Sequence, residues 1–371
     1  MAEKSWVEVV RSLGADFAAR SAAHDSDDSF VAANYAALME QGVFAAGVPS
    51  ELGGPGATHA ELCAMIRELA HHCSSTALAV SMHTHLVATL AYLWQHGNKG
   101  PEPLLRRVVS EKLILVSTGG SDWLPGSGKL EKVEGGYRLT GRKIFGSGVP
   151  AGHILMTTGV YDDPKDGATV FHVPVPLKSE GVKVLDTWRV LGMRGTGSHD
   201  IQLDSVFVPD ASAGGVKRPA GKWHPFMHTA ALVACPVFYA AYLGTAEAAR
   251  DLAIAMAKKK KDDHVALLVG EMENQLVTAQ LAHAAMVDLV KTEAPGPAAT
   301  NATICRRTIF VKAAIATVEK AMEAAGGGAF YRGNTLERLF RDIQGARYHP
   351  VQEKPQVRYT GRFLLGLDID G

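Results

Sequence analysis

The sequence predicts an α+β protein built from a helical N-terminal part, a β-rich middle part and a C-terminal helical bundle. Its 371 residues exceed a single domain of the usual size, about 150 residues. The spacing of apolar residues changes from a helical to a strand-like period near residue 113 and becomes helical again after residue 223. Hydrophobic residues make up 47% of the chain and charged residues 20%, which is typical of a globular protein with a large core. We place the domains at residues 1–111, 112–212 and 213–371.

The N-terminal part is helical in its pattern over residues 3–110. In VEVVRSLGADFAARSA and HAELCAMIRELAHHC, for example, apolar residues return every three or four positions. The sequence Asn98-Lys99-Gly100-Pro101 breaks the pattern before one more short helix.

The middle part is strand-like over residues 113–209. Its segments LILVS, HILMTTGVY and ATVFHVPV are short and rich in β-branched residues. Glycine, aspartate and proline separate them, as expected for strands joined by turns.

Helices return in long segments in the C-terminal part, and we expect them at 226–259, 264–292, 298–325 and 352–366. The segments KKKKDD (258–263), APGPAAT (294–300) and AAGGGAF (324–330) separate them. The longest apolar run, Ala230 to Gly244, contains Pro236 and is too short for a comfortable membrane span. It predicts a buried helix and no membrane partner.

The composition also excludes several classes of function. Lys and Arg total 38 and Asp and Glu total 38, so no net field would gather nucleic acid or anionic lipid. The four cysteines have no CxxC spacing and no metal-type pairing with histidine, which suits a reducing cytoplasm without a bound metal. The N-terminus MAEKSWVEVV has no apolar signal region, so we expect no secretion signal.

Three segments carry a resemblance to one family. GGYRLTGRKIFGSG (135–148) and LGMRGTGSHDIQLDSVFVP (191–209) resemble the middle domain of the acyl-CoA dehydrogenase superfamily, and EAAGGGAFYRGNTLERLFRD (323–342) resembles its C-terminal signature. The resemblance implies a β-barrel-like middle domain and a C-terminal four-helix bundle, with a flavin between them. It also implies a homotetramer built as a dimer of dimers.

The resemblance further implies a set of flavin contacts. Phe145 would face the flavin ring and Ser147 would bond near its N5 atom, although Ser147 between two glycines also suits a turn. In the loop before Trp123, the flavin contacts would be Ser117, Thr118 and Ser121. The pair Gly326 and Gly327 matches the glycines under the neighbouring subunit's cofactor, and as residues they equally suit a helix C-cap. Arg194 and Ser198 match a stretch near the cavity and the subunit contacts.

Two departures from the family pattern change the expected chemistry. An acyl-CoA dehydrogenase needs a carboxylate base, but the C-terminal turn 346–350 has none, and the first long bundle helix has none before Glu247. The family's Arg-x-x-Phe-Gly, which holds FAD, is replaced by KKKKDDHVALLVGEMENQ (258–275). A lysine offers a phosphate only a point charge and not a guanidinium fork. Flavin delivered in reduced form, FAD by family precedent or FMN, fits this pattern.

With these departures the chain resembles the two-component flavin monooxygenases of the superfamily most. The resemblance implies a reductase partner, reduced flavin, O2, a C4a-hydroperoxyflavin and a small organic substrate. The catalytic residues would be His349 on the C-terminal turn, Ser147 beside N5, and His83. His85 is the alternative to His83, because residues two apart cannot share one helix face.

Two other classes of function stay open at the level of sequence. One is an acyl-CoA dehydrogenase whose base has moved, for example to Glu247. The other is a non-catalytic scaffold that keeps the fold and has lost the flavin.

Overall fold

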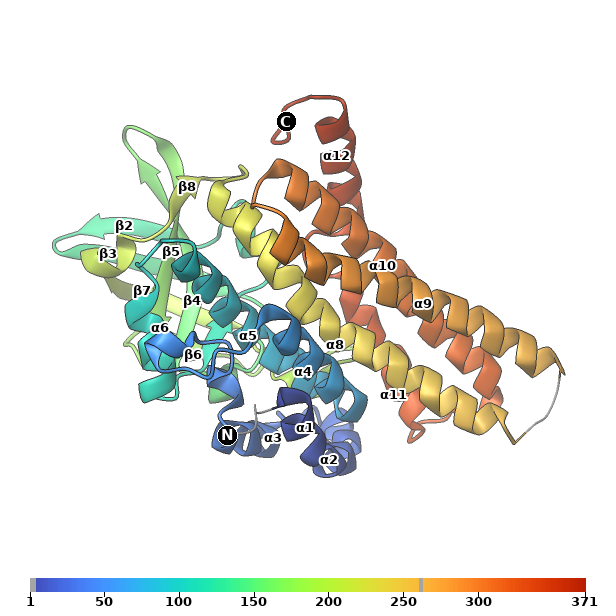
Figure 1. The fold of residues 1–371 in the computed structure, drawn as a ribbon. Helices are drawn as coiled ribbons and strands as arrows, with labels where there is room; N and C mark the ends of the chain where they lie inside the picture. Colours follow the sequence, from blue (N-terminus) through green and yellow to red (C-terminus); the bar gives the residue numbers. More distant parts are fainter. Residues whose placement is uncertain (1–4, 260–262) are drawn as a thin grey trace.

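The computed structural model describes residues 5–259 and 263–371 and has the three predicted parts. Figure 1 shows the N-terminal helices against one side of helix α8, with the sheet beyond them and the pair α9 and α10 on the other side. The N-terminal elements are α1 (Trp6–Ser12), α2 (Gly14–Asp27), α3 (Ala32–Glu40), the 3-10 turns η1 (Val43–Ala45) and η2 (Ser50–Leu52), α4 (His59–His72), α5 (Ser74–Gln95) and α6 (Glu102–Ser110).

The middle part is one mixed sheet. Its strands run in the order β6-β7-β3-β2-β4-β5-β8, and β1 pairs with β4 in parallel. The order has two ends, at β6 and β8, so the barrel-like sheet stays open within the described residues. The strands are β1 (Leu115–Ser117), β2 (Lys129–Val133), β3 (Gly136–Lys143), β4 (Ile154–Asp163), β5 (Gly167–Pro176), β6 (Val182–Val184), β7 (Ile201–Pro209) and β8 (Lys217–Pro219). The sequence pattern did not predict the short strand β8.

The C-terminal helices lie close to the predicted ranges, and a short helix, α7 (Asp210–Ala213), precedes them at the end of the sheet. They are α8 (Pro225–Ala257), α9 (Asp263–Thr292), α10 (Pro297–Ala325), α11 (Thr335–Ile343) and α12 (Glu353–Leu364). Local chemistry fixes where such helices start. At α4, for example, the Thr58 hydroxyl accepts from the N–H of Glu61, while the Glu61 carboxylate accepts from the N–H of Thr58.

One hydrophobic core joins the N-terminal and C-terminal helices. It runs from Val10 and Met65 through Val237 and Tyr242 to Phe310. A second cluster fills the interior of the sheet. Helices α5 and α8 are long and apolar enough to cross a membrane, but 72% and 89% of their most apolar windows are buried inside the protein. The predicted buried helix over the run 230–244 is therefore confirmed as the centre of the core.

The loop between β6 and β7 is where all three parts meet. The backbone N–H of Met193 donates to the Asp342 carboxylate on α11 (2.5 Å), and Arg341 donates to the carbonyl of Leu191 (3.1 Å). Arg341 also bonds bidentately to Asp25 on α2, at 2.5 and 2.8 Å. This charged junction orients the β loop against both helical parts.

We expect Arg341→Met to lower the free energy of unfolding by about 3 kcal/mol, because it removes the guanidinium that Asp25 and Glu337 share and, among the described residues, leaves Asp25 only Arg194 at 4.0 Å. The measurement is urea unfolding followed by circular dichroism. Arg107→Met is the matched control, since the Arg107–Glu111 pair is half exposed on α6, and such a pair contributes less than about 1 kcal/mol. Equal losses in both variants would contradict a structural role for the junction.

Candidate active site

The segment after strand β3 presents an exposed aromatic ring beside a buried hydroxyl. Phe145 has a left-handed backbone (φ 57°) and is 47% exposed. Its ring meets Trp188 edge to face at 5.9 Å. A Cβ atom on Gly119 would lie 2.7 Å from the Phe145 ring, so only glycine lets the 117–122 loop pass there. A flat ring could rest on this platform, as the flavin prediction requires.

Ser147 belongs to a chain of three buried hydroxyls. Its Oγ lies 2.7 Å from Ser198 Oγ, which lies 2.7 Å from Thr196 Oγ1. Thr196 and Ser198 are 0% and 2% exposed. A buried donor left without an acceptor costs about 1–3 kcal/mol. The favoured polarity therefore runs from Thr196 to Ser198 to Ser147, which leaves the Ser147 proton to be donated to a ligand.

The 117–122 loop is held by a buried carboxylate, Asp122. This carboxylate accepts from the Thr118 hydroxyl, from Thr157 Oγ1 (3.0 Å) and from the buried ammonium of Lys143 (3.2 Å). Ser117 ends strand β1 and is buried. The predicted contact Ser121 belongs to the 3-10 turn η3 (Gly120–Asp122), but its side chain lies outside the described residues.

His349 lies on the turn that follows the 3-10 turn η7 (Gln344–Arg347) and is walled by aromatic rings of α8. Its ring stacks on Phe238 at 5.2 Å and meets Tyr242 and Tyr239 at 5.5 and 6.5 Å. Burial, and after it the charge of Arg307, lowers the pKa of His349 to about 4. At neutral pH the ring is uncharged, so it offers one N–H donor and one acceptor and does not act as an imidazolium.

His83 and His85 occupy different sides of α5. His83 is fully buried, its Nε2 bonds to the Phe44 carbonyl (2.7 Å) and its Nδ1 accepts from the N–H of Leu115 (2.9 Å). Both nitrogens are thus engaged, Nε2 with the 3-10 turn η1 and Nδ1 with strand β1, which argues against a catalytic His83. The His85 ring contacts Phe238 at 5.9 Å, on the element that carries the His349 stack. Burial and then the neighbouring His349 lower the pKa of His85 to about 3.

The fold brings most predicted site residues to one place. Gly120, in the loop that packs on Phe145, adjoins the turn of His349, because a Cβ there would lie 3.9 Å from Pro350. Gly326 and Gly327 lie elsewhere, where the 3-10 turn η6 (Gly327–Phe330) packs on α10 and α11. Gly326 ends α10 with φ 79° and ψ −172°, and a Cβ on Gly327 would meet nothing within 4 Å.

Glu247, the alternative base, is held as a structural anion. Its carboxylate accepts from Arg67, from His71 (3.0 Å) and from Gln280 (2.6 Å). Burial alone would raise its pKa, but these three hydrogen bonds outweigh burial and lower the pKa to about 2. A carboxylate so stabilised is a weak base for abstracting a proton from carbon.

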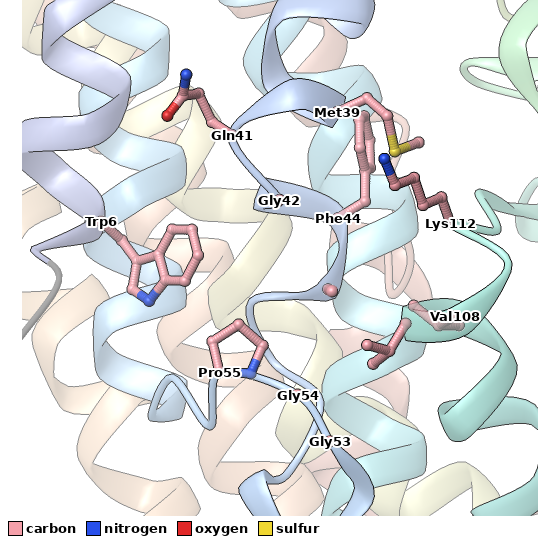
Figure 2. Close-up of a pocket in the computed structure, with 12 residues that line it drawn as sticks. Trp6, Met39, Gln41, Gly42, Phe44, Gly53, Gly54, Pro55, Val108 and Lys112 are labelled. Atoms are coloured by element: carbon pink, nitrogen blue, oxygen red, sulfur yellow. The ribbon is translucent and has the colours of Figure 1, made fainter.

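A groove of about 380 Å³ lies on the N-terminal helices and is lined by none of the predicted site residues. Figure 2 shows Trp6 and Pro55 on one side of it and Val108 and Lys112 on the other. Its wall residue Phe44 separates it from His83, whose ring it meets at 5.3 Å. The groove is therefore distinct from the candidate site.

Sequence reasoning missed the residues that surround His349. Phe238 and Tyr242 looked like ordinary core positions, since aromatic residues on a buried helix usually are. Arg307 did carry a signal, because it falls on the apolar stripe of α10 between the buried Ile304 and Phe310. An arginine in such a stripe requires a buried partner.

Two family models match the chain. Residues 2–100 match the acyl-CoA dehydrogenase N-terminal domain and residues 237–353 match the acyl-CoA dehydrogenase C-terminal domain. Together they span more than half of the chain, which therefore belongs to the acyl-CoA dehydrogenase superfamily of flavin-dependent oxidoreductases. The family resemblance and the fold predicted from it are confirmed.

Relatives with individual functions are also similar over nearly the whole chain. An amino sugar nitrososynthase, RubN8 of Streptomyces rubradiris, is 29% identical over 95% of this chain and 87% of its own length. The oxygenase subunit HsaA of a flavin-dependent monooxygenase of Rhodococcus jostii is 27% identical over 89% of this chain and 90% of its own. The structure of KijD3 in complex with FMN and dTDP-3-amino-2,3,6-trideoxy-4-keto-3-methyl-D-glucose has a TM-score of 0.89 and 25% identity, over 100% of this chain and 96% of that chain.

The hydroxyl chain predicts non-additive effects on flavin affinity. Ser147→Ala removes the donor, and Ser198→Ala removes the group that orients it, so each should weaken flavin binding by about tenfold, the value of one neutral hydrogen bond. In the Ser147→Ala background, Ser198→Ala should add little. Fluorescence titration of the four proteins with reduced and oxidised FMN and FAD measures this. Additive losses would show that Ser198 does not act through Ser147.

Two of the histidines whose pKa is lowered, His83 and His349, predict acid lability. Burial lowers the pKa of His83 and His349 to about 4, against 6.5 in the unfolded chain. Between these values the unfolded state binds more protons, so stability present above pH 6.5 is lost as the pH falls toward 4. Each such histidine contributes about 1.4 kcal/mol per pH unit. Burial raises the pKa of Asp342 to about 6, which opposes part of this loss.

Urea unfolding at pH 7.5, 6.0 and 5.0 measures the direction in which stability changes with pH. The free energy of unfolding should fall at each step toward acid. A constant or rising value would mean that these rings are solvated in the folded protein.

Proposed function

We propose that this protein is the oxygenase component of a two-component flavin monooxygenase that acts on a small organic substrate. It would receive reduced flavin, FMN or FAD, from a separate reductase. With two electrons from the flavin, one atom of O2 enters the substrate and the other leaves as water. The similarity to HsaA and to the nitrososynthase RubN8 supports this class of reaction.

The observation that carries the proposal is the chemistry of the C-terminal turn. On this turn a dehydrogenase of the family usually carries its carboxylate base. Here the turn carries His349, an uncharged ring that packs against Phe238 and Tyr242. The other candidate base, Glu247, is bonded to Arg67, His71 and Gln280. A neutral imidazole can donate its N–H to a polar oxygen intermediate and keep it from water, which an oxygenase needs.

The residues after β3 fit a flavin. Phe145 and Trp188 offer an aromatic surface, and the Ser147 hydroxyl offers a donor whose direction Ser198 and Thr196 set. Ser117 and Thr118 would line the ring edge from strand β1, with Ser121 as their neighbour in the loop. In this arrangement Ser147 orients the cofactor, and His349 with His85 faces the substrate side.

The proposal includes an assembly and a compartment. We infer a homotetramer in the cytoplasm, with Gly326 and Gly327 under the cofactor of a neighbouring subunit. Phe330 and Tyr331, just after these glycines, are 83% and 74% exposed, and an assembled neighbour would cover them. The four cysteines are free thiols, which suits a reducing compartment.

We expect His349→Ala to uncouple flavin oxidation from oxygenation. Reduced FMN or FAD should still bind, while the rate of product formation falls about 10²–10⁴-fold, the usual cost of losing one acid–base group, and hydrogen peroxide increases. The measurement mixes anaerobic reduced flavin and protein with O2 and compares peroxide with product over a substrate panel. His96→Ala, on an exposed ring stacked on Tyr92, is the control that should change neither.

The same preparations separate the rival functions. An acyl-CoA dehydrogenase would turn over short, medium or long acyl thioesters in a dye-coupled assay, and Glu247→Gln would abolish that activity. A scaffold would show no saturable binding of any flavin. An unstable His349→Ala protein with normal coupling would give the ring a packing role only.

A further inference from the structure

The guanidinium of Arg307 on α10 is bonded to the turn that carries His349. Arg307 is 2% exposed. Its Nη2 donates to the carbonyls of Ala346 (3.0 Å), Arg347 (3.3 Å) and His349 (3.0 Å). Its Nε donates to the Tyr239 hydroxyl (2.6 Å), which in turn donates to the His349 carbonyl (3.3 Å). One side chain thus satisfies three carbonyls of the turn.

In the described part of the chain, no carboxylate forms a direct ion pair with this cation, although its charge helps to lower the pKa of Glu353. Glu353, the acidic residue that starts α12, is paired with Lys312 (2.8 Å). Backbone carbonyls solvate the guanidinium without cancelling its charge, so its field reaches the neighbouring imidazole.

We propose that Arg307 is the positioning residue of this site: its buried fork fixes the path of turn 346–349 and holds the imidazole of His349 against Phe238 and Tyr242. The planar guanidinium holds Nη2 on the turn and Nε on Tyr239 at the same time, in a fixed relation that an ammonium cannot reproduce. The inference goes beyond the proposed function, because the placement of the ring can be measured without a flavin or a substrate.

A second consequence concerns the protonation of His349. Burial and then Arg307 lower the pKa of the ring to about 4. Burial also lowers the pKa of His85 on α5 and raises the pKa of Tyr239 and Tyr242 on α8, so these three neighbours are uncharged at neutral pH. Asp342 on α11 accepts from Met193 (2.5 Å), and Glu353 on α12 is paired with Lys312. Among the described residues, Arg307 is therefore the cation whose charge lowers the pKa of His349.

The test follows the His349 ring by NMR on protein labelled with 13C-histidine, the signal being assigned by its loss in His349→Asn. In the natural protein the ring should stay neutral down to about pH 5. In Arg307→Met its pKa should rise by on the order of one unit, since removal of a neighbouring charge favours the protonated form. Arg306→Met, the adjacent arginine that donates to Ala302 on its own helix, should leave the titration unchanged.

Arg307→Lys separates the effect of the positive charge from the effect of the guanidinium geometry. It also provides the test if Arg307→Met does not fold. It keeps the positive charge, so the pKa of His349 should stay low. It lacks the fork, so the ring should lose its fixed place, the His349 signal should broaden or move from its aromatic-shifted position, and product per reduced flavin should fall several-fold.

Two results would overturn the inference. One is an unchanged His349 titration in Arg307→Met. The other is an Arg307→Lys protein with the ring shift and product yield of the natural protein. Because the titration uses no flavin, a protein that binds no flavin would defeat the proposed function and leave this test intact.

Discussion

Buried cations that donate to backbone carbonyls hold the loops of the candidate site in place. A loop inside a protein has no helix or ladder to satisfy its carbonyls, and each unsatisfied group costs about 1–3 kcal/mol. Arg218 supplies a donor to Leu124 (2.5 Å), Lys143 to Ser127 (2.7 Å), and Arg307 to the C-terminal turn. Long cationic side chains suit this task, because they reach from a regular element into a loop with several donors. The positions of Phe145, Ser147 and His349 depend on these bonds or on the loops that they hold.

Interactions of the same kind set the charge of ionisable side chains in the protein interior. Glu247 lies on α8 and His349 packs against that helix, yet Glu247 is charged and His349 is neutral at neutral pH. Glu247 receives hydrogen bonds from Arg67, His71 and Gln280, and its pKa is lowered to about 2. His349 faces a cation and aromatic rings, and its pKa is lowered to about 4. At neutral pH Glu247 is therefore an anion held within the core, and His349 is an uncharged ring.

The shared core explains why loops from three parts of the chain can form one site. Helices α5 and α8 pack in the same hydrophobic cluster, so His85 on one and Phe238 on the other meet at 5.9 Å. Arg341 and Asp342 fix the β6–β7 loop against α2 and α11. That loop carries Trp188 and Ser198, which support Phe145 and Ser147. Packing in one core thus fixes the relative positions of residues that are far apart in sequence.

The sequence by itself determined the order of elements, the buried helix over 230–244 and the superfamily, because hydrophobic period and local motifs report the conformation of each segment. The sequence also indicated Phe145, Ser147 and His349 as candidate site residues. Only the tertiary structure showed that both ring nitrogens of His83 are hydrogen-bonded, gave Glu247 its partners and placed Arg307 on the turn. Each of these depends on which residue from a distant segment fills the neighbouring space. A periodic pattern shows that a side chain faces inward, but the pKa and bonds of that side chain come from the partner that packing supplies.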